Sequence, residues 1–130
     1  ALSARVEMEI SQLDAEDRQA FMDDLGIEVP ALELVVQHAY QLLGLIPFFT
    51  VGKDEVKAWT IEMGTTAVKA AGKIHSDIER GFIRAEVLAY DDFVACNGDF
   101  VKAKETGKLR LEGKEYVVQD GDIINFRFNV

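Results

Sequence analysis

The fold is decided by the second half of the chain, where residues 67–82 read AVKAAGKIHSDIERGF, residues 83–87 read IRAEV and residues 119–130 read QDGDIINFRFNV. Small residues spaced with Ile74 and Ile78 predict a helix over about 66–80, and the same spacing leaves Lys69, Lys73 and Arg80 outward. The alternation in IRAEV predicts a half-buried strand whose inward residues are Ile83, Ala85 and Val87. An Asp-Gly turn then leads into a last strand with Ile124, Phe126 and Phe128 on one face.

The segments around this stretch complete an α+β pattern. The apolar run 46–51 and the run 56–61, joined by a turn at 52–55, predict a hairpin. Residues 91–97 predict a short helix or turn, residues 102–107 a polar connection, and 109–111 with 116–118 a second hairpin. Two strands, a helix, a strand, a turn and two strands follow the order of the β-grasp fold. Phe48, Phe49 and Trp59 are expected in its core.

The first third of the chain has a different pattern. Residues 2–10 alternate between apolar and polar, which predicts a short strand whose sheet would lie outside this chain. Asp14 is a good N-cap for a helix reaching about Leu25, where Gly26 supplies the C-terminal cap. Pro30 begins a second helix, which Gly44 ends. Its apolar stripe comprises Leu32, Val35, Val36, Ala39, Leu42 and Leu43.

Composition sets further limits on the 130-residue chain. A single cysteine, Cys96, excludes an internal disulfide and a cysteine zinc cluster, and favours a reducing, cytoplasmic setting. No apolar run approaches the roughly 20 residues that cross a bilayer. The net charge of −9 divides unevenly: residues 1–44 carry −7 and residues 45–130 only −2. The start at Ala1 suggests a fragment or a trimmed product.

The second half resembles a TGS domain, the ubiquitin-like β-grasp module of threonyl-tRNA synthetases, stringent-response synthetases and Obg-related GTPases. With VKAWTI at residues 56–61 it is similar to the Obg-like, ribosome-associated ATPases of the YchF type. The resemblance implies that residues 1–44 are the end of a P-loop nucleotide domain and residues 45–130 a TGS domain. It also implies that Ser3 and Ala4 lie near a nucleotide base, but only together with the missing nucleotide domain.

The resemblance further implies ATP or GTP with magnesium in the intact parent. The chain itself has no Gly-x-x-x-x-Gly-Lys-Ser/Thr phosphate loop, so we expect neither hydrolysis nor a bound cofactor. No nucleophile has a visible base partner, and we name no catalytic and no metal-binding residue. Expected partners are the ribosome or RNA and the rest of the ATPase chain, without a membrane and without DNA specificity.

The basic residues of the second half are the candidates for nucleic-acid contact. Arg84 and Arg127 lie on strands that a β-grasp sheet places side by side. The alternative is ordinary solubility charge, with Lys73 and Asp77 as a helical ion pair. His75 is expected to cap or pack at the helix edge, or to touch a polynucleotide backbone. The candidates are Lys69, Lys73, His75, Arg80, Arg84, Lys102, Lys104, Lys108, Arg110 and Arg127.

Other functions remain open beside RNA or ribosome binding. The chain could serve as a protein-interaction module, as a small-ligand sensor, or as part of an enzyme whose nucleotide site Ser3 and Ala4 complete. A ubiquitin-type carrier is disfavoured because the sequence ends Phe128-Asn129-Val130 and not in Gly-Gly.

Overall fold

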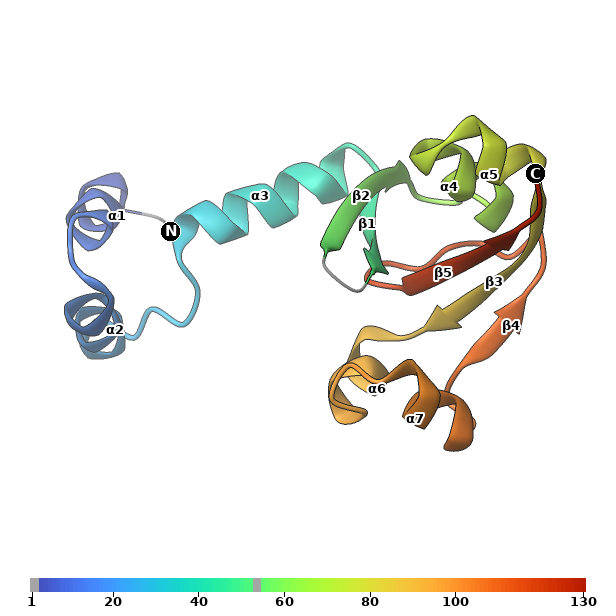
Figure 1. Ribbon diagram of the computed structural model, residues 1–130. Helices are drawn as coiled ribbons and strands as arrows, with labels where there is room; N and C mark the ends of the chain where they lie inside the picture. Colours follow the sequence, from blue (N-terminus) through green and yellow to red (C-terminus); the bar gives the residue numbers. More distant parts are fainter. Residues whose placement is uncertain (1–2, 53–54) are drawn as a thin grey trace. The chain divides into compact units, whose positions relative to one another are not determined.

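The chain forms two compact units, of which the first ends at Leu43 and the second begins at Gly44. A computed structural model describes residues 3–52 and 55–130. Unit 1 contains helices α1 (Ala4–Ser11), α2 (Ala15–Asp24) and α3 (Ala31–Leu42), drawn in blue to cyan in Figure 1. Unit 2 contains the sheet and the remaining helices, from green to red. Each unit is described by itself.

The strand predicted over residues 2–10 is wrong, because Ala4–Ser11 is a helix. Ser3 caps it, its Oγ accepting a hydrogen bond from the Val6 amide at 3.5 Å. The alternating pattern of residues 2–10 is also compatible with a helix, because Val6 and Ile10 are four residues apart and therefore lie on one helical face. Ile10 is buried, whereas Met8, which a strand would have put beside it, is 55% exposed. Leu2 lies outside the described residues.

The other two helices of unit 1 follow their predicted caps. Asp14 accepts a hydrogen bond from the Asp17 amide at 3.0 Å and begins α2, and Gly26 after its end has a φ of +65°. Pro30 precedes α3. Glu7 ties the first helix to the third, since its Oε2 accepts a hydrogen bond from the Ala31 amide at 3.1 Å. The apolar stripe of α3 is largely exposed, at 76% for Leu32 and 88% for Leu42.

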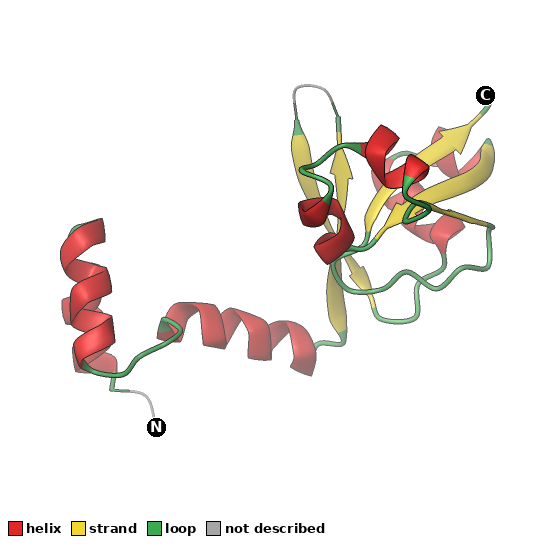
Figure 2. Cartoon of the chain, turned by 90° about the horizontal axis from the view of Figure 1, so that it is seen from below, coloured by secondary structure: helices red, strands yellow, loops and turns green. Residues whose placement is uncertain are grey.

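Unit 2 is built on one five-stranded sheet of β-grasp topology, which confirms the predicted fold class. Its strands are β1 (Leu45–Val51), β2 (Val56–Glu62), β3 (Phe82–Leu88), β4 (Arg110–Glu112) and β5 (Ile123–Phe128). Their order is β2-β1-β5-β3-β4, with β1 parallel to β5 and the other neighbours antiparallel. The β1–β2 hairpin is confirmed; the turn residues Lys53 and Asp54 lie outside the described residues. Figures 1 and 2 show helices on both sides of this sheet.

The predicted long helix is broken in two at His75. It forms α4 (Ala67–Ile74) and α5 (Ser76–Arg80), and His75 between them is extended, with φ −162° and ψ 142°. The His75 Nδ1 accepts a hydrogen bond from the Asp77 amide at 3.1 Å, so this side chain caps α5. Ala67, Ala70 and Ala71 of α4 are fully buried against the sheet, because small side chains let the helix approach it closely.

Aromatic side chains fill the space between α4, α5 and the sheet. The ring of Phe126 lies with its centroid 6.1 Å from that of Phe48 and 6.0 Å from that of Phe82. Trp59 packs at the edge of this core and is half-buried; its Nε1 donates a hydrogen bond to Thr50 Oγ1 at 2.9 Å. The Lys57 ammonium lies 4.2 Å from the centre of its ring.

A bulge in β3 changes which residues reach this core. The pairing with β5 shifts between Phe82 and Arg84, so Phe82 joins Ala85 and Val87 on the core side. Ile83, predicted to point inward, is instead 52% exposed. An extra residue in one strand of an antiparallel pair reverses the alternation beyond it, and a simple period of two cannot show this.

A second, smaller cluster covers one end of the opposite sheet face. Helices α6 (Tyr90–Ala95) and α7 (Phe100–Glu105) pack around Leu88, Cys96 and Ala103. The predicted connection over 102–107 is therefore wrong: Asp99 caps α7 by accepting a hydrogen bond from the Val101 amide at 2.8 Å. The predicted hairpin of 109–111 with 116–118 is also wrong. β4 pairs with β3, and Val117 makes an isolated bridge with Thr66.

Candidate nucleic-acid interface

The sheet of unit 2 has one covered face and one partly open face. Helices α4 and α5 cover the first, and α6 and α7 lie beyond the second (Figure 1). Directly paired residues in neighbouring strands point to the same side of a sheet. Arg84 pairs with Arg127, and Glu86 pairs with both Asn125 and Leu111. These five residues form what we call the open face, and the predicted adjacency of the two arginines holds.

The open face continues into a pocket at the foot of α7. Its cavity volume is about 340 Å³, within the range of small-ligand sites. We call it the basic pocket; its lining is Arg84, Glu86, Lys104, Leu109, Leu111 and Arg127. Three of the ten predicted cations thus meet here with a single acid.

Ion pairing inside the basic pocket leaves part of its positive charge unbalanced. The Glu86 side chain is 17% exposed; its Oε1 lies 3.1 Å from Arg127 Nε, and its Oε2 accepts a hydrogen bond from Asn125 Nδ2 at 2.8 Å. Arg84 and Lys104 are exposed, and neither has an ion-pair partner among the residues that the structure describes. They are the groups of this pocket that remain available to an anion.

Several other predicted cations are bound to acids of the same chain. Lys69 Nζ lies 2.7 Å from Glu79 Oε1, and this hydrogen bond with the attraction of the carboxylate raises the pKa of Lys69. Lys108 Nζ lies 3.1 Å from Asp92 Oδ1. The expected pair of Lys73 with Asp77 is not found. The carboxylate of Asp77 instead contacts Arg80 and lies 3.7 Å from His75 Nδ1.

Lys73 and Lys102 complete the set of predicted cations, apart from Arg110. Both are exposed, Lys73 on α4 and Lys102 on α7. Neither side chain has an ion-pair partner in the described part of the chain. Lys102 lies two residues from Lys104 of the basic pocket, whereas Lys73 belongs to the helices of the covered face. The structure therefore does not bring all ten candidates to one surface.

Arg110 belongs to a partly buried polar network that the sequence did not reveal. Its Nη2 lies 3.0 Å from the Tyr116 hydroxyl and 3.7 Å from Asp122 Oδ1. Burial lowers the pKa of Arg110, but the Tyr116 hydroxyl and the carboxylates of Asp122 and Glu112 outweigh this and raise it overall. Asp122, in the Asp-Gly-Asp turn, is only 3% exposed. Arg110 therefore stabilises the fold and is less available to a ligand.

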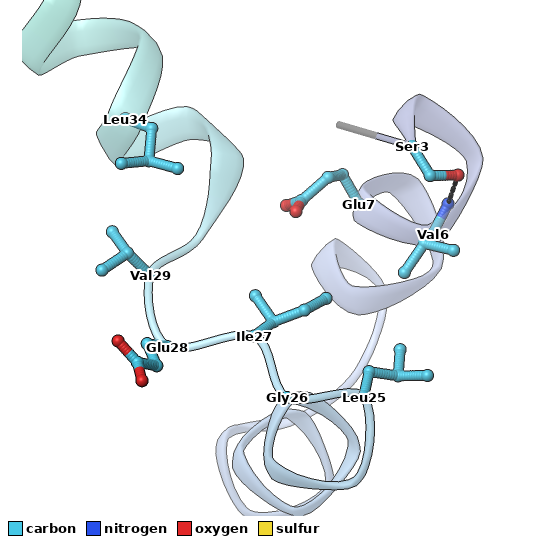
Figure 3. Close-up of a pocket in the computed structure, with 9 residues that line it drawn as sticks. All are labelled: Ser3, Val6, Glu7, Leu25, Gly26, Ile27, Glu28, Val29 and Leu34. Carbon is cyan, nitrogen blue, oxygen red and sulfur yellow. Dashed lines mark hydrogen bonds between the residues drawn. The ribbon is translucent and has the colours of Figure 1, made fainter. Parts of the chain in front are cut away.

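The predicted base-contacting residues, Ser3 and Ala4, lie at the start of α1. Ser3 borders a cavity of about 550 Å³ within unit 1, shown in Figure 3. Its hydroxyl is occupied in capping, and the cavity walls are mostly apolar, with Glu7 and Glu28 as the charged members. Two carboxylates repel phosphate, so this cavity does not suit the phosphate end of a nucleotide.

The described ranges, 3–52 and 55–130, contain neither a group of side chains suited to a metal ion nor a helix suited to spanning a membrane. Within them no group of three or more His, Cys, Asp or Glu side chains could hold a metal ion. Within the same ranges no helix has the length and apolar character needed to cross a membrane.

Comparison with known proteins gives one family and a consistent set of relatives. The family YchF-GTPase_C, described as "Protein of unknown function (DUF933)", matches residues 45–129. The chain is 57% identical to the "Ribosome-binding ATPase YchF" of Haemophilus influenzae over 127 residues, which are 98% of the chain and 35% of that protein. It is 55% identical to the protein of the same name from Bacillus subtilis, again over 98% of the chain but 34% of that protein.

A solved structure agrees with these sequence relatives. The structure of the Schizosaccharomyces pombe YchF GTPase superposes with a TM-score of 0.78 at 34% identity, over 92% of this chain and 31% of that one. The chain therefore spans about a third of the length of the relatives that it matches.

Proposed function

The chain belongs to the YchF-GTPase_C family, and from this premise we propose that unit 2 forms an RNA-contacting surface of a ribosome-binding ATPase. The relatives' printed name, "Ribosome-binding ATPase YchF", supports the ribosome as partner. The whole protein would bind ATP or GTP with magnesium in the cytoplasm. Its phosphate-binding residues would lie outside this chain, with Ser3 and Ala4 completing the base end.

The proposal rests on the cations that line the basic pocket. Arg84, Arg127 and Lys104 meet in one pocket, although unit 2 as a whole is slightly acidic. Such local concentration matters because RNA binding depends on phosphates neutralised at one surface and not on total charge. No preference for a DNA sequence is proposed.

Ion pairing narrows the ten candidate residues to those that are free to act. We propose that the RNA-contacting cations are Arg84 and Lys104 of the basic pocket, with Lys102 two residues away on α7. Arg127 lines the same pocket but is paired with Glu86, and Lys73 is unpaired but belongs to the helices of the covered face. Lys69, Arg80, Lys108 and Arg110 are held by neighbouring acids, and His75 caps α5, so their roles are structural.

Cosedimentation with purified ribosomal subunits tests the proposal. Reversing Lys102 and Lys104 to Glu should abolish binding, whereas reversing Arg5 and Arg18 of unit 1 to Glu should not, although both variants change the charge equally. The logarithm of the affinity should fall linearly with the logarithm of salt concentration, by about 0.7 per phosphate on single strands. Binding that ignores salt, or that both variants reduce equally, would contradict an electrostatic RNA contact through unit 2.

A second candidate function rests on α3. Five large apolar side chains of its stripe are exposed, namely Leu32, Val35, Val36, Leu42 and Leu43. A contiguous apolar stripe of this size is typical of a surface that another protein segment covers. We propose that it packs against the rest of the ATPase chain, which would make unit 1 a docking element and leave RNA contact to unit 2.

A further inference from the structure

The basic pocket joins two kinds of surface that a nucleotide needs together. Its cationic part is Arg84, Lys104 and Arg127, and its apolar part is Leu109 and Leu111. Leu109 packs on the small cluster around Leu88, which fixes its position, and Leu111 is 58% exposed on the edge strand β4. A phosphate alone would need only the cations, and an apolar ligand only the leucines. The combination suits an anionic group attached to a flat, weakly polar body.

The pocket exists because α7 covers only one end of this face of the sheet. Helix α7 packs over Leu88 at one end of β3, while Arg84 further along the strand is exposed. The pocket forms where the cover of α7 ends, with Lys104 of α7 on one side and the paired Arg84 and Arg127 of the sheet on the other. Charged side chains therefore approach it from two directions.

From this arrangement, and resting on the proposed RNA contact, we infer that the basic pocket binds one unpaired ribonucleotide of RNA. Arg84 and Lys104 hold its phosphate, and Leu109 and Leu111 contact its ribose and base. Unpaired bases can be splayed out of the chain to enter such a hollow, whereas an A-form duplex is contacted across its wide, shallow groove. The pocket thereby distinguishes single-stranded from double-stranded RNA.

Glu86 sets the strength of this site. It neutralises Arg127 across 3.1 Å and is held in place by Asn125. An incoming phosphate meets this carboxylate as well as the cations, so Glu86 opposes binding. Replacing it by Gln retains an acceptor for Asn125 and releases the charge of Arg127. Glu86→Gln should therefore tighten binding, unlike the other substitutions in the pocket.

The test measures fluorescence anisotropy of a short labelled oligouridylate, and of an RNA duplex of equal length, with the full 130-residue chain. Arg84→Ala should weaken single-strand binding about tenfold, the effect of one lost charge-assisted contact, and should reduce the salt slope by about 0.7. Glu86→Gln should strengthen it a few-fold. Leu111→Ser should weaken it without altering the salt slope.

Two matched variants serve as controls. Lys114→Ala removes an exposed positive charge from unit 2 outside the pocket, and Val56→Ser changes an exposed apolar residue on the opposite edge strand, β2. Neither should change binding. Circular dichroism of every variant should match that of the parent chain, since all the substituted residues except Glu86 are exposed.

The outcomes separate this inference from the function on which it rests. RNA binding with Arg84→Ala and Glu86→Gln indistinguishable from Lys114→Ala would overturn the pocket and leave RNA contact standing. Equal affinity for duplex and single strand would also overturn it. No RNA binding by the chain would remove both proposals. Binding of labelled polyglutamate with the same response to Arg84→Ala, and none of RNA, would make the pocket an acidic-peptide site instead.

Discussion

The hydroxyl of Tyr116 donates a hydrogen bond of 2.7 Å to the buried carboxylate of Asp122, across the loop that leads into β5. The same carboxylate accepts the Gln119 amide at 2.9 Å. The Tyr116 carbonyl in turn accepts the Ala67 amide, at the start of α4, at 2.7 Å. Tyr116 thus connects the central helix to the turn before the last strand, and Arg110 adds the balancing positive charge.

Removal of this hydroxyl should destabilise unit 2. Tyr116→Phe leaves a buried carboxylate short of a donor, which typically costs about 1–3 kcal/mol. Tyr90→Phe is the matched control, because Tyr90 is 57% exposed. Urea unfolding followed by fluorescence should show a lower midpoint for Tyr116→Phe only. Equal midpoints would mean that the network contributes nothing to stability.

The same tyrosine should make stability fall at high pH. Burial, together with the Asp122 hydrogen bond, raises the pKa of Tyr116 to about 12 from 10.0. The unfolded chain loses this proton first, so the contribution is complete below pH 10 and is lost between 10 and about 12. Ultraviolet titration of the parent chain minus Tyr116→Phe should isolate this late ionisation. A difference curve with its midpoint near 10 would contradict it.

Gly81 should not tolerate a side chain. A Cβ at this position would clash with the backbone of Asn129, whose amide donates a hydrogen bond of 2.9 Å to the Gly81 carbonyl. Gly81→Ala should therefore lower the free energy of unfolding by about 1–3 kcal/mol, as overpacking does. Gly113→Ala, where a Cβ meets open space, is the control. Thermal melts that coincide for the two variants would show that the chain end moves aside freely.

Unit 1 should open before unit 2. The buried apolar residues among its described positions are Ile10, Met22 and Ala31, whereas the main core of unit 2 joins twelve. Hydrogen exchange should release the amides of residues 4–24 well before those of Val87 and Ile124. If the chain is monomeric at all concentrations and the amides of both units are equally protected from exchange, the prediction is wrong.

The stripe of α3 should cause self-association when nothing covers it. Leu42 is 88% exposed on this helix, and the neighbouring Gln41 is exposed and polar. Light scattering after size exclusion should show an apparent mass that rises with concentration. Leu42→Ser should reduce the rise and Gln41→Ser should leave it unchanged. A concentrated chain that stays monomeric would argue against an apolar docking role for α3.

The chain should neither hydrolyse nor tightly bind ATP or GTP. Its sequence lacks a phosphate loop, whose backbone amides and lysine supply most phosphate contacts in such enzymes. Calorimetry with ATP and magnesium should give no measurable heat of binding. Micromolar affinity would contradict this prediction and reveal a nucleotide site that does not depend on a phosphate loop.

The sequence predicted those elements for which local pattern and tertiary packing agree. The β1–β2 hairpin, α2 and α3 follow from periodicity, turns and caps, and the pairing of Arg84 with Arg127 follows from the strand order of a β-grasp sheet. The strand prediction for residues 2–10 is wrong because these nine residues fit a period of two and a helical face equally well. The pattern predicts a polar connection over 102–107 in place of the end of α7, because polar side chains conceal the cap at Asp99 and the buried Ala103.

The candidate site was less predictable because side-chain pairing depends on tertiary structure. Charge counting could not show that Glu86 would neutralise Arg127, since this requires the register of β3 with β5 and the bulge between Phe82 and Arg84. Glu79 reaches Lys69 only because Gly72 leaves room for its carboxylate over α4. The buried position of Asp122 likewise follows from the packing of β5 and not from its turn motif.

Trp59 makes the two units optically distinguishable. It is the chain's single tryptophan and lies in unit 2, with its indole N–H bonded to Thr50 and its ring beneath the Lys57 ammonium. Tryptophan emission therefore reports the β-grasp core alone, while the helical signal in circular dichroism includes α1, α2 and α3 of unit 1. A melt followed at both signals on one sample separates the loss of the helical unit from the loss of the sheet, without a label or a truncated chain.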